Sequence, residues 1–185
     1  MHTERGNGDA LQIRPLPATG GATLPQIAAV CPEPLRALLG TVAGVSTIRL
    51  PGTLPADSFD LYCPLLSLPR VLNFTLDNLP LRFLTSAYRR ILSCRLPNAG
   101  RFKVGLAWSW QRRSGKRDRQ RSCPLSELLP LFTLPSIAFY SLQVPVTAAD
   151  AALLLPGVHN LEPELSDYAR TAAYVHQLDF GHQRL

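Results

Sequence analysis

The sequence lacks several features that define common classes of protein. No stretch holds the roughly 18 to 20 apolar residues that a membrane-spanning helix needs, and the N-terminal part contains no uninterrupted apolar block of the signal-peptide type. The four cysteines include no Cys-x-x-Cys pair, and His159, His176 and His182 have no partners at metal-ligand spacing. We therefore expect a cytoplasmic chain with reduced thiols, no membrane span and no metal site.

Proline and glycine are instead abundant, with 17 and 12 residues in a chain of 185. This favours short helices and strands joined by turns. Apolar residues form 46% of the sequence, which is ample for a core. Strand-like and helix-like segments alternate, a pattern that favours a parallel sheet in an α/β fold. The predicted strands span 27–30, 45–50, 59–63, 102–108, 137–142 and 158–161, and the predicted helices lie within 6–17 and at 34–39, 86–94, 124–132, 148–154 and 165–177.

The most informative stretch spans residues 102–122, FKVGLAWSWQRRSGKRDRQRS, where a hydrophobic strand pattern ends abruptly in a basic loop. The stretch holds seven Arg or Lys and one Asp. Loops at the carboxyl edge of an α/β sheet bind anionic ligands, because loop amides, helix N-termini and arginine side chains converge there. The pattern indicates a nucleotide or sugar-nucleotide site. A solvated charge run is the alternative that the charges alone leave open.

Five motifs follow one another in an order typical of one protein family. They are GNGDALQ at 6–12, FDLYCPLLSLP at 59–69, KVGLAW at 103–108, DRQRS at 118–122 and SLQ at 141–143. In this order they resemble the glycosyltransferase-like region that follows tetratricopeptide repeats in many bacterial proteins, a relative of the heptosyltransferases. The resemblance implies two Rossmann-like domains of the glycosyltransferase-B type. It assigns residues 1–96, with the first strand largely missing, to an acceptor-side domain and 97–185 to a donor-side domain.

The resemblance also implies roles for residues of the glycine-rich turn. Gly6 and Gly8 permit close approach of the backbone to a substrate, and Asp9 corresponds to a general base that deprotonates an acceptor hydroxyl. A helix N-cap is the alternative role for Asp9. Asp60, near Ser67, is a weaker candidate for lining the cleft between domains, whereas the neighbouring apolar residues Phe59, Leu61 and Leu65 are expected in the core.

In the basic loop the resemblance points to three residues. Lys116, Arg119 and Arg121 match positions that face the donor phosphates, where they would offset the charge of a departing nucleoside diphosphate. Trp110 stands where the family has glycine, and its bulk is expected to hinder a phosphate. After residue 178 the family continues into a donor-binding segment, whereas this chain reads LDFGHQRL. The resemblance therefore implies an incomplete second domain, a chain inactive alone, and a complementary C-terminal fragment as a candidate partner.

Three function classes stay open at this point. The first is an inverting glycosyltransferase that uses a nucleotide sugar as donor and needs no metal or other cofactor. The second is a basic module that binds polyanions or proteins, since the net charge is +6 and the sequence pI is about 9.5. The third is a catalytically empty remnant of the fold. Only Trp108 and Trp110 lie near the basic run, so specific nucleic-acid binding is not expected.

Overall fold

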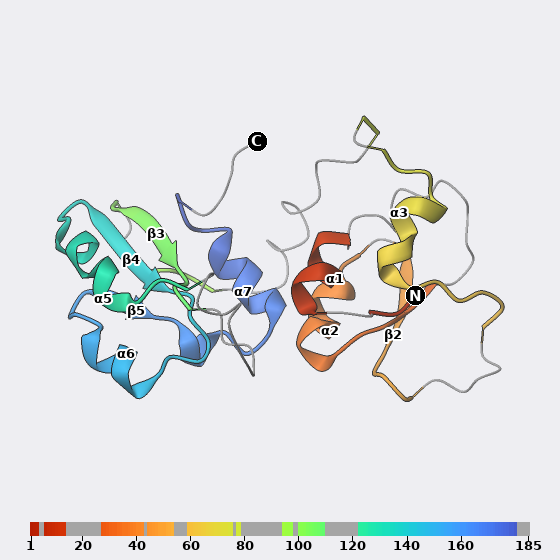
Figure 1. Cartoon of the computed structure of the whole chain (residues 1–185), viewed down its shortest axis with the longest axis horizontal. Helices are drawn as coiled ribbons and strands as arrows, with labels where there is room; N and C mark the ends of the chain where they lie inside the picture. The colour runs from red at the N-terminus through yellow and green to blue at the C-terminus, as the bar shows by residue number, and fades with distance from the viewer. Residues whose placement is uncertain are drawn as a thin grey trace. The chain divides into compact units, whose positions relative to one another are not determined.

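The chain forms short helices and parallel strands in two small sheets (Figure 1). The computed structural model describes residues 1–3, 6–13, 27–42, 44–53, 59–75, 77–78, 94–97, 100–109 and 122–180. The chain divides into an N-terminal unit, residues 1–91 with 167–169, and a C-terminal unit, residues 92–166 with 170–185. Among the described residues, no helix is long and apolar enough to cross a membrane.

The N-terminal unit contains a parallel pair of strands extended by two short segments. Its elements are α1 (Asn7–Ile13), β1 (Ile27–Val30), α2 (Glu33–Leu39), β2 (Val45–Arg49), the 3-10 helix η2 (Leu65–Ser67) and α3 (Leu68–Val71). β1 pairs with β2 in parallel. His2 forms parallel bridges with Val30 and Pro64, so residues 1–3 lie between β1 and Pro64. The order across the sheet is therefore β2, β1, residues 1–3 and Pro64.

The core of the N-terminal unit forms where α1, α2 and η2 pack together. Pro34 lies in the first turn of α2, where a backbone N–H would have no partner inside the helix, so the missing N–H of proline removes no helical hydrogen bond. Leu35 and Leu39 lie on the buried side of this helix. They join Ala10 of α1 and Leu65 of η2 in one apolar cluster.

The C-terminal unit contains three parallel strands and most of the last helix. Its elements are β3 (Phe102–Leu106), α5 (Leu125–Leu128), the 3-10 helix η4 (Leu129–Thr133), β4 (Ile137–Ser141), α6 (Ala148–Leu153), β5 (Val158–Asn160), the 3-10 helix η5 (Glu162–Glu164) and α7 (Tyr168–Val175). β4 lies between β3 and β5. On the other edge of β3, Val104 forms a parallel bridge with Phe180. The order is therefore β5, β4, β3 and Phe180.

Both units thus arrange their strands in the same order. In each, the second and third strand segments lie on one side of the first, and the fourth returns to its other side. With the strand segments numbered along the chain, the order is 3-2-1-4, which is that of the first four strands of a doubly wound Rossmann fold, so each unit is compatible with a Rossmann-like architecture. Successive strands are first added on one side of the first strand and then on its other side, so the strand order reverses beside residues 1–3 in one unit and beside β3 in the other. Ligands of open α/β sheets bind at such topological switch points.

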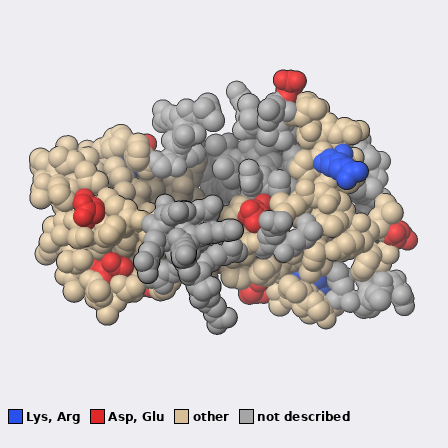
Figure 2. Space-filling model, in the orientation of Figure 1, with Lys and Arg blue, Asp and Glu red and all other residues tan. Residues whose placement is uncertain are grey.

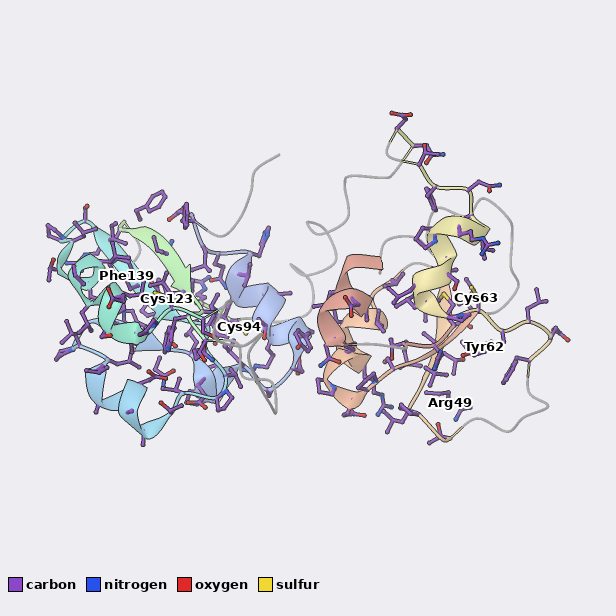
Figure 3. The ribbon with its side chains drawn as sticks, viewed as in Figure 1. Arg49, Tyr62, Cys63, Cys94, Cys123 and Phe139 are labelled. Atoms are coloured by element: carbon purple, nitrogen blue, oxygen red, sulfur yellow. The ribbon has the colours of Figure 1, made fainter. Side chains whose placement is uncertain are left out.

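Helical segments cover both faces of the C-terminal sheet. Ala138 and Tyr140 of β4 pack with Tyr174 and Leu178, in α7 and just beyond it. Successive residues of a strand point to opposite faces, and Phe139 contacts Phe132 of η4, with ring centroids 5.2 Å apart (Figures 1 and 3). β4 is accordingly buried along most of its length.

Most predicted elements are confirmed within a few residues, but the strand at 59–63 is wrong. Phe59 is 44% exposed and Leu61 is 83% exposed, so neither belongs to the core, whereas Leu65 is buried as expected. The segment reaches the sheet at its end, where Pro64 forms a bridge with His2, the Cys63 carbonyl accepts the His2 N–H at 3.3 Å and the Leu65 N–H donates to the His2 carbonyl at 2.9 Å. The alternating pattern in FDLYC predicted a strand, but a strand needs a neighbour along its whole length to satisfy its backbone groups. The predicted helix 86–94 lies outside the described residues except for Cys94.

Candidate functional site

The carboxyl edge of β3 is held by one buried side chain, Gln143, which follows β4. Its Oε1 accepts hydrogen bonds from the backbone N–H groups of Trp108 at 3.2 Å and Ser109 at 3.0 Å. Its Nε2 donates to the carbonyl oxygens of Ser109 at 3.1 Å and Pro145 at 3.4 Å. Gln143 is only 3% exposed, so these bonds replace the water that the amide loses on burial. The side chain fixes the backbone where it leaves β3.

The two ends of the basic segment meet at this same edge. The backbone N–H of Cys123 donates to the carbonyl oxygen of Trp108 at 2.8 Å. The described residues on either side of the basic segment, Ser109 and Ser122, therefore both lie near the carboxyl end of β3, the strand that also bridges Phe180 through Val104. Lys116, Arg119 and Arg121 lie outside the described residues, and their phosphate-binding role stays a prediction.

The described charged side chains do not mark an anion site by themselves. On the face shown in Figure 2, the Lys, Arg, Asp and Glu side chains of the described residues lie singly and do not gather into a patch. The densest run of positive charge in the sequence is the segment 112–121. This segment follows β3 in the sequence and holds six Arg or Lys.

Trp108 is the second notable residue at this edge. Its side chain is 4% exposed, and its indole Nε1 is buried without a hydrogen-bond acceptor among the described residues. Buried polar groups in native proteins nearly always have a partner, so an unpaired indole N–H calls for an explanation.

In the N-terminal unit, the glycine-rich turn leads into α1. The carbonyl of Gly6 accepts the backbone N–H groups of Asp9 and Ala10 at 3.1 and 3.4 Å. Asp9 is the third residue of α1 and is exposed. The N-cap alternative for Asp9 is therefore wrong, because its backbone already lies inside the helix. Gly8 has open space where a Cβ would stand, and the general-base role of Asp9 stays a prediction.

The third predicted constellation does not lie at the end of a strand. Asp60 is exposed at a bend, and Ser67 closes the 3-10 helix η2. η2 packs against α1, so Ser67 and the Gly6–Asp9 turn lie on neighbouring elements. Nothing in the sequence indicated that the glycine-rich turn and the segment with Ser67 lie close together; the packing of α1 against η2 brings them near each other.

A cavity of about 470 Å³ lies in the C-terminal unit, away from the predicted residues. Glu164 accepts hydrogen bonds from Arg170 at 3.0 Å and from the Tyr174 hydroxyl at 3.3 Å. Burial raises the pKa of Tyr174, and the neighbouring Cys94 and Glu164 raise it further. Cys94, labelled in Figure 3, and Arg95 complete the polar wall. The ion pair between Arg170 and Glu164 is partly exposed, and it neutralises two of the three charged side chains that line the cavity.

The four cysteines are free thiols with different exposures. Cys31 is buried, Cys63 and Cys94 are partly buried, and Cys123 is exposed. Burial raises the pKa of Cys31, as does the Glu33 carboxylate, while Arg36 opposes the shift. Among the described residues, no group of His, Cys, Asp and Glu is arranged to hold a metal ion.

Two parts of this arrangement were missed by sequence reasoning. The motif SLQ at 141–143 was used only as one of the five motifs that resemble the glycosyltransferase-like family. Its glutamine, Gln143, in fact accepts the backbone N–H groups of Trp108 and Ser109 just after β3. The cavity carries no sequence signal, because Cys94 and Tyr174 lie 80 positions apart.

No protein-family model, curated protein or solved structure matches this chain.

Proposed function

We propose that the chain is a glycosyltransferase-like protein whose C-terminal unit binds the nucleoside diphosphate part of a nucleotide sugar at the carboxyl edge of β3. One observation carries the proposal. The segment richest in Arg and Lys begins and ends at this edge, closed by the bond from Cys123 to Trp108. The edge adjoins the topological switch point beside Phe180, where open α/β sheets bind their ligands.

The chemistry of the segment suits a diphosphate. Arginine binds phosphate oxygens through paired hydrogen bonds, which Arg119 and Arg121 can supply, and Lys116 adds a single positive charge. In sugar transfer the acceptor hydroxyl attacks the anomeric carbon as the bond to the diphosphate breaks. A base takes the hydroxyl proton, which is the role proposed for Asp9, and the cations stabilise the charge on the leaving diphosphate.

Calorimetric titration of the full chain with UDP-, GDP-, ADP- and CMP-linked sugars tests the proposal. We expect saturable binding of one nucleotide, weakened about tenfold or more in Arg119→Ala and Arg121→Ala, because each loses a charge-assisted hydrogen bond. Arg101→Ala is the matched control. It removes the same charge from the same unit, but at an exposed position before the amino end of β3.

The alternative of a basic polyanion-binding module gives a different result in the same titrations. Binding would then be weak for every anion, would fall steeply as salt rises, and would be lowered equally by Arg101→Ala and Arg119→Ala. Saturable binding of a single nucleotide that persists at moderate salt favours the donor site. The absence of any binding would leave only a catalytically empty remnant.

A further inference from the structure

The cavity of about 470 Å³ in the C-terminal unit has a wall that side-chain hydrogen bonds hold in place. This wall is the segment from Cys94 to Pro97, and residues of η5 and α7 form the remainder. Gln177 donates from Nε2 to the Cys94 carbonyl oxygen at 3.0 Å, and its Oε1 accepts the Leu96 N–H at 3.1 Å. The Tyr140 hydroxyl donates to the carbonyl oxygen of Pro97. A site that is ordered before its ligand arrives loses little conformational entropy on binding.

The cavity has an open side and an apolar floor. Arg95 and Pro97, which line it, are exposed, so a small molecule can enter along this segment. Leu161 and Tyr174 also line it, and each is only 6% exposed. Apolar surface combined with a few polar groups is typical of small-molecule sites.

One positive charge of the cavity is unbalanced. Its three charged lining residues are Arg95, Arg170 and Glu164. The Glu164 carboxylate accepts hydrogen bonds from Arg170 at 3.0 Å and from the Tyr174 hydroxyl at 3.3 Å. Within the described part of the chain, no carboxylate lies at ion-pair distance from Arg95. The Arg95 guanidinium is therefore the group that a ligand meets first, and one excess positive charge suits a monoanion.

We propose that this cavity binds a small organic monocarboxylate, held by the Arg95 guanidinium, with its hydrocarbon part against Leu161 and Tyr174. The planar guanidinium matches a carboxylate through two parallel hydrogen bonds. The apolar floor favours an anion with a hydrocarbon part over inorganic phosphate, and the nearby Glu164 disfavours more highly charged anions. None of the described lining residues belongs to the β3 edge, so the inference does not depend on the proposed function.

Cys94 provides a readout inside the cavity. Its thiol lines the site and is partly buried, and Cys63 is a partly buried thiol of the other unit that serves as an internal reference. The full chain is alkylated with iodoacetamide at constant ionic strength, and peptide mass spectrometry follows each cysteine. The probes are benzoate, isovalerate, the neutral benzamide and inorganic phosphate. We expect benzoate or isovalerate to slow Cys94 alkylation saturably, by about threefold at twice the dissociation constant, since only the free protein reacts. Cys63 should react at an unchanged rate.

Three variants test the role of the guanidinium. Arg95→Gln should weaken carboxylate binding about tenfold, as expected for the loss of a charge-assisted hydrogen bond. Arg95→Lys keeps the charge but not the paired donors, so it should give an intermediate affinity. Arg101→Gln is the matched control, because Arg101 is also exposed in this unit but is not among the described lining residues. Rates with and without probe are compared within each variant, which removes any effect of the substitution on the thiol itself.

Saturation-transfer NMR of benzoate with the wild type and Arg95→Gln is a second measurement that needs no thiol. Protection of Cys94 by a carboxylate, together with an NMR signal that Arg95→Gln loses and Arg101→Gln keeps, supports the site. Equal protection by phosphate and benzoate overturns the carboxylate class, and equal affinity of the wild type and Arg95→Gln overturns the role of Arg95. Neither protection nor an NMR signal with any carboxylate overturns the whole inference, whereas the nucleotide titrations at the β3 edge are decided separately.

Discussion

Replacing Gln143 by leucine tests whether this side chain closes the carboxyl edge of β3. Leucine has a similar size but neither donates nor accepts a hydrogen bond. In Gln143→Leu the backbone N–H groups of Trp108 and Ser109 lose their acceptor, and the carbonyl of Ser109 loses its donor. The burial of Gln143, 3% exposed, limits how far water replaces these bonds.

The expected magnitude follows from the number of groups left unpaired. Each buried polar group without a partner costs about 1 to 3 kcal/mol. Ser109 is only partly buried, so water satisfies some of its groups, and removing the buried amide offsets part of the cost. We expect Gln143→Leu to lower the free energy of unfolding by about 2 to 4 kcal/mol, a large share of the roughly 5 to 15 kcal/mol that stabilises a typical domain.

The assay is urea denaturation followed by tryptophan fluorescence. Both tryptophans, Trp108 and Trp110, belong to the C-terminal unit, so the signal reports that unit. Thr133→Val is the control, because it removes an exposed bond from Thr133 Oγ1 to Pro130 that water readily replaces. A difference of less than about 0.5 kcal/mol between Gln143→Leu and the wild type would show that the Gln143 hydrogen bonds do not stabilise the fold, since so small a change is ordinary for surface substitutions.

Two further predictions concern packing and thiol chemistry. A Cβ on Gly105 would meet Leu178 Cδ1 at 2.3 Å, so Gly105→Ala should lower the free energy of unfolding by about 1 to 3 kcal/mol in the fluorescence assay. A Cβ on Gly8 would have no atom within 4 Å, so Gly8→Ala should leave the free energy of unfolding unchanged or raise it by up to about 1 kcal/mol, measured by circular dichroism. Equal effects of Gly105→Ala and Gly8→Ala would contradict the packing argument. At pH 8 Cys123 should react with a disulfide reagent far faster than Cys31, which is buried and has a raised pKa. Because folding raises the Cys31 pKa above its usual 9.0, the stabilising contribution is fully present below about pH 9 and is lost as pH rises above it; stability that rises in that range would contradict the assignment.

Local sequence patterns predicted most of the individual elements. Short apolar runs such as 27–30 and 137–142 became strands because their residues are buried in a sheet. The segment 59–63 was also predicted as a strand, yet it forms none, because its contact with the sheet is limited to the bridge between Pro64 and His2 and the backbone bonds of Cys63 and Leu65 beside it. Periodicity shows which residues suit a strand, but a strand forms only beside a partner that accepts its hydrogen bonds.

From the amino-acid sequence alone we could predict the α/β class, the alternation of strands and helices that favours a parallel sheet, and the position of the basic segment directly after β3. Those properties depend on neighbours along the chain, which the sequence contains directly. Two features became visible in the folded chain: the fourth strand position lies beside the first in both units, and Gln143 binds Trp108 and Ser109 across 34 to 35 positions. Strand order and buried hydrogen bonds depend on which segments meet in space, and a single sequence does not specify those contacts residue by residue.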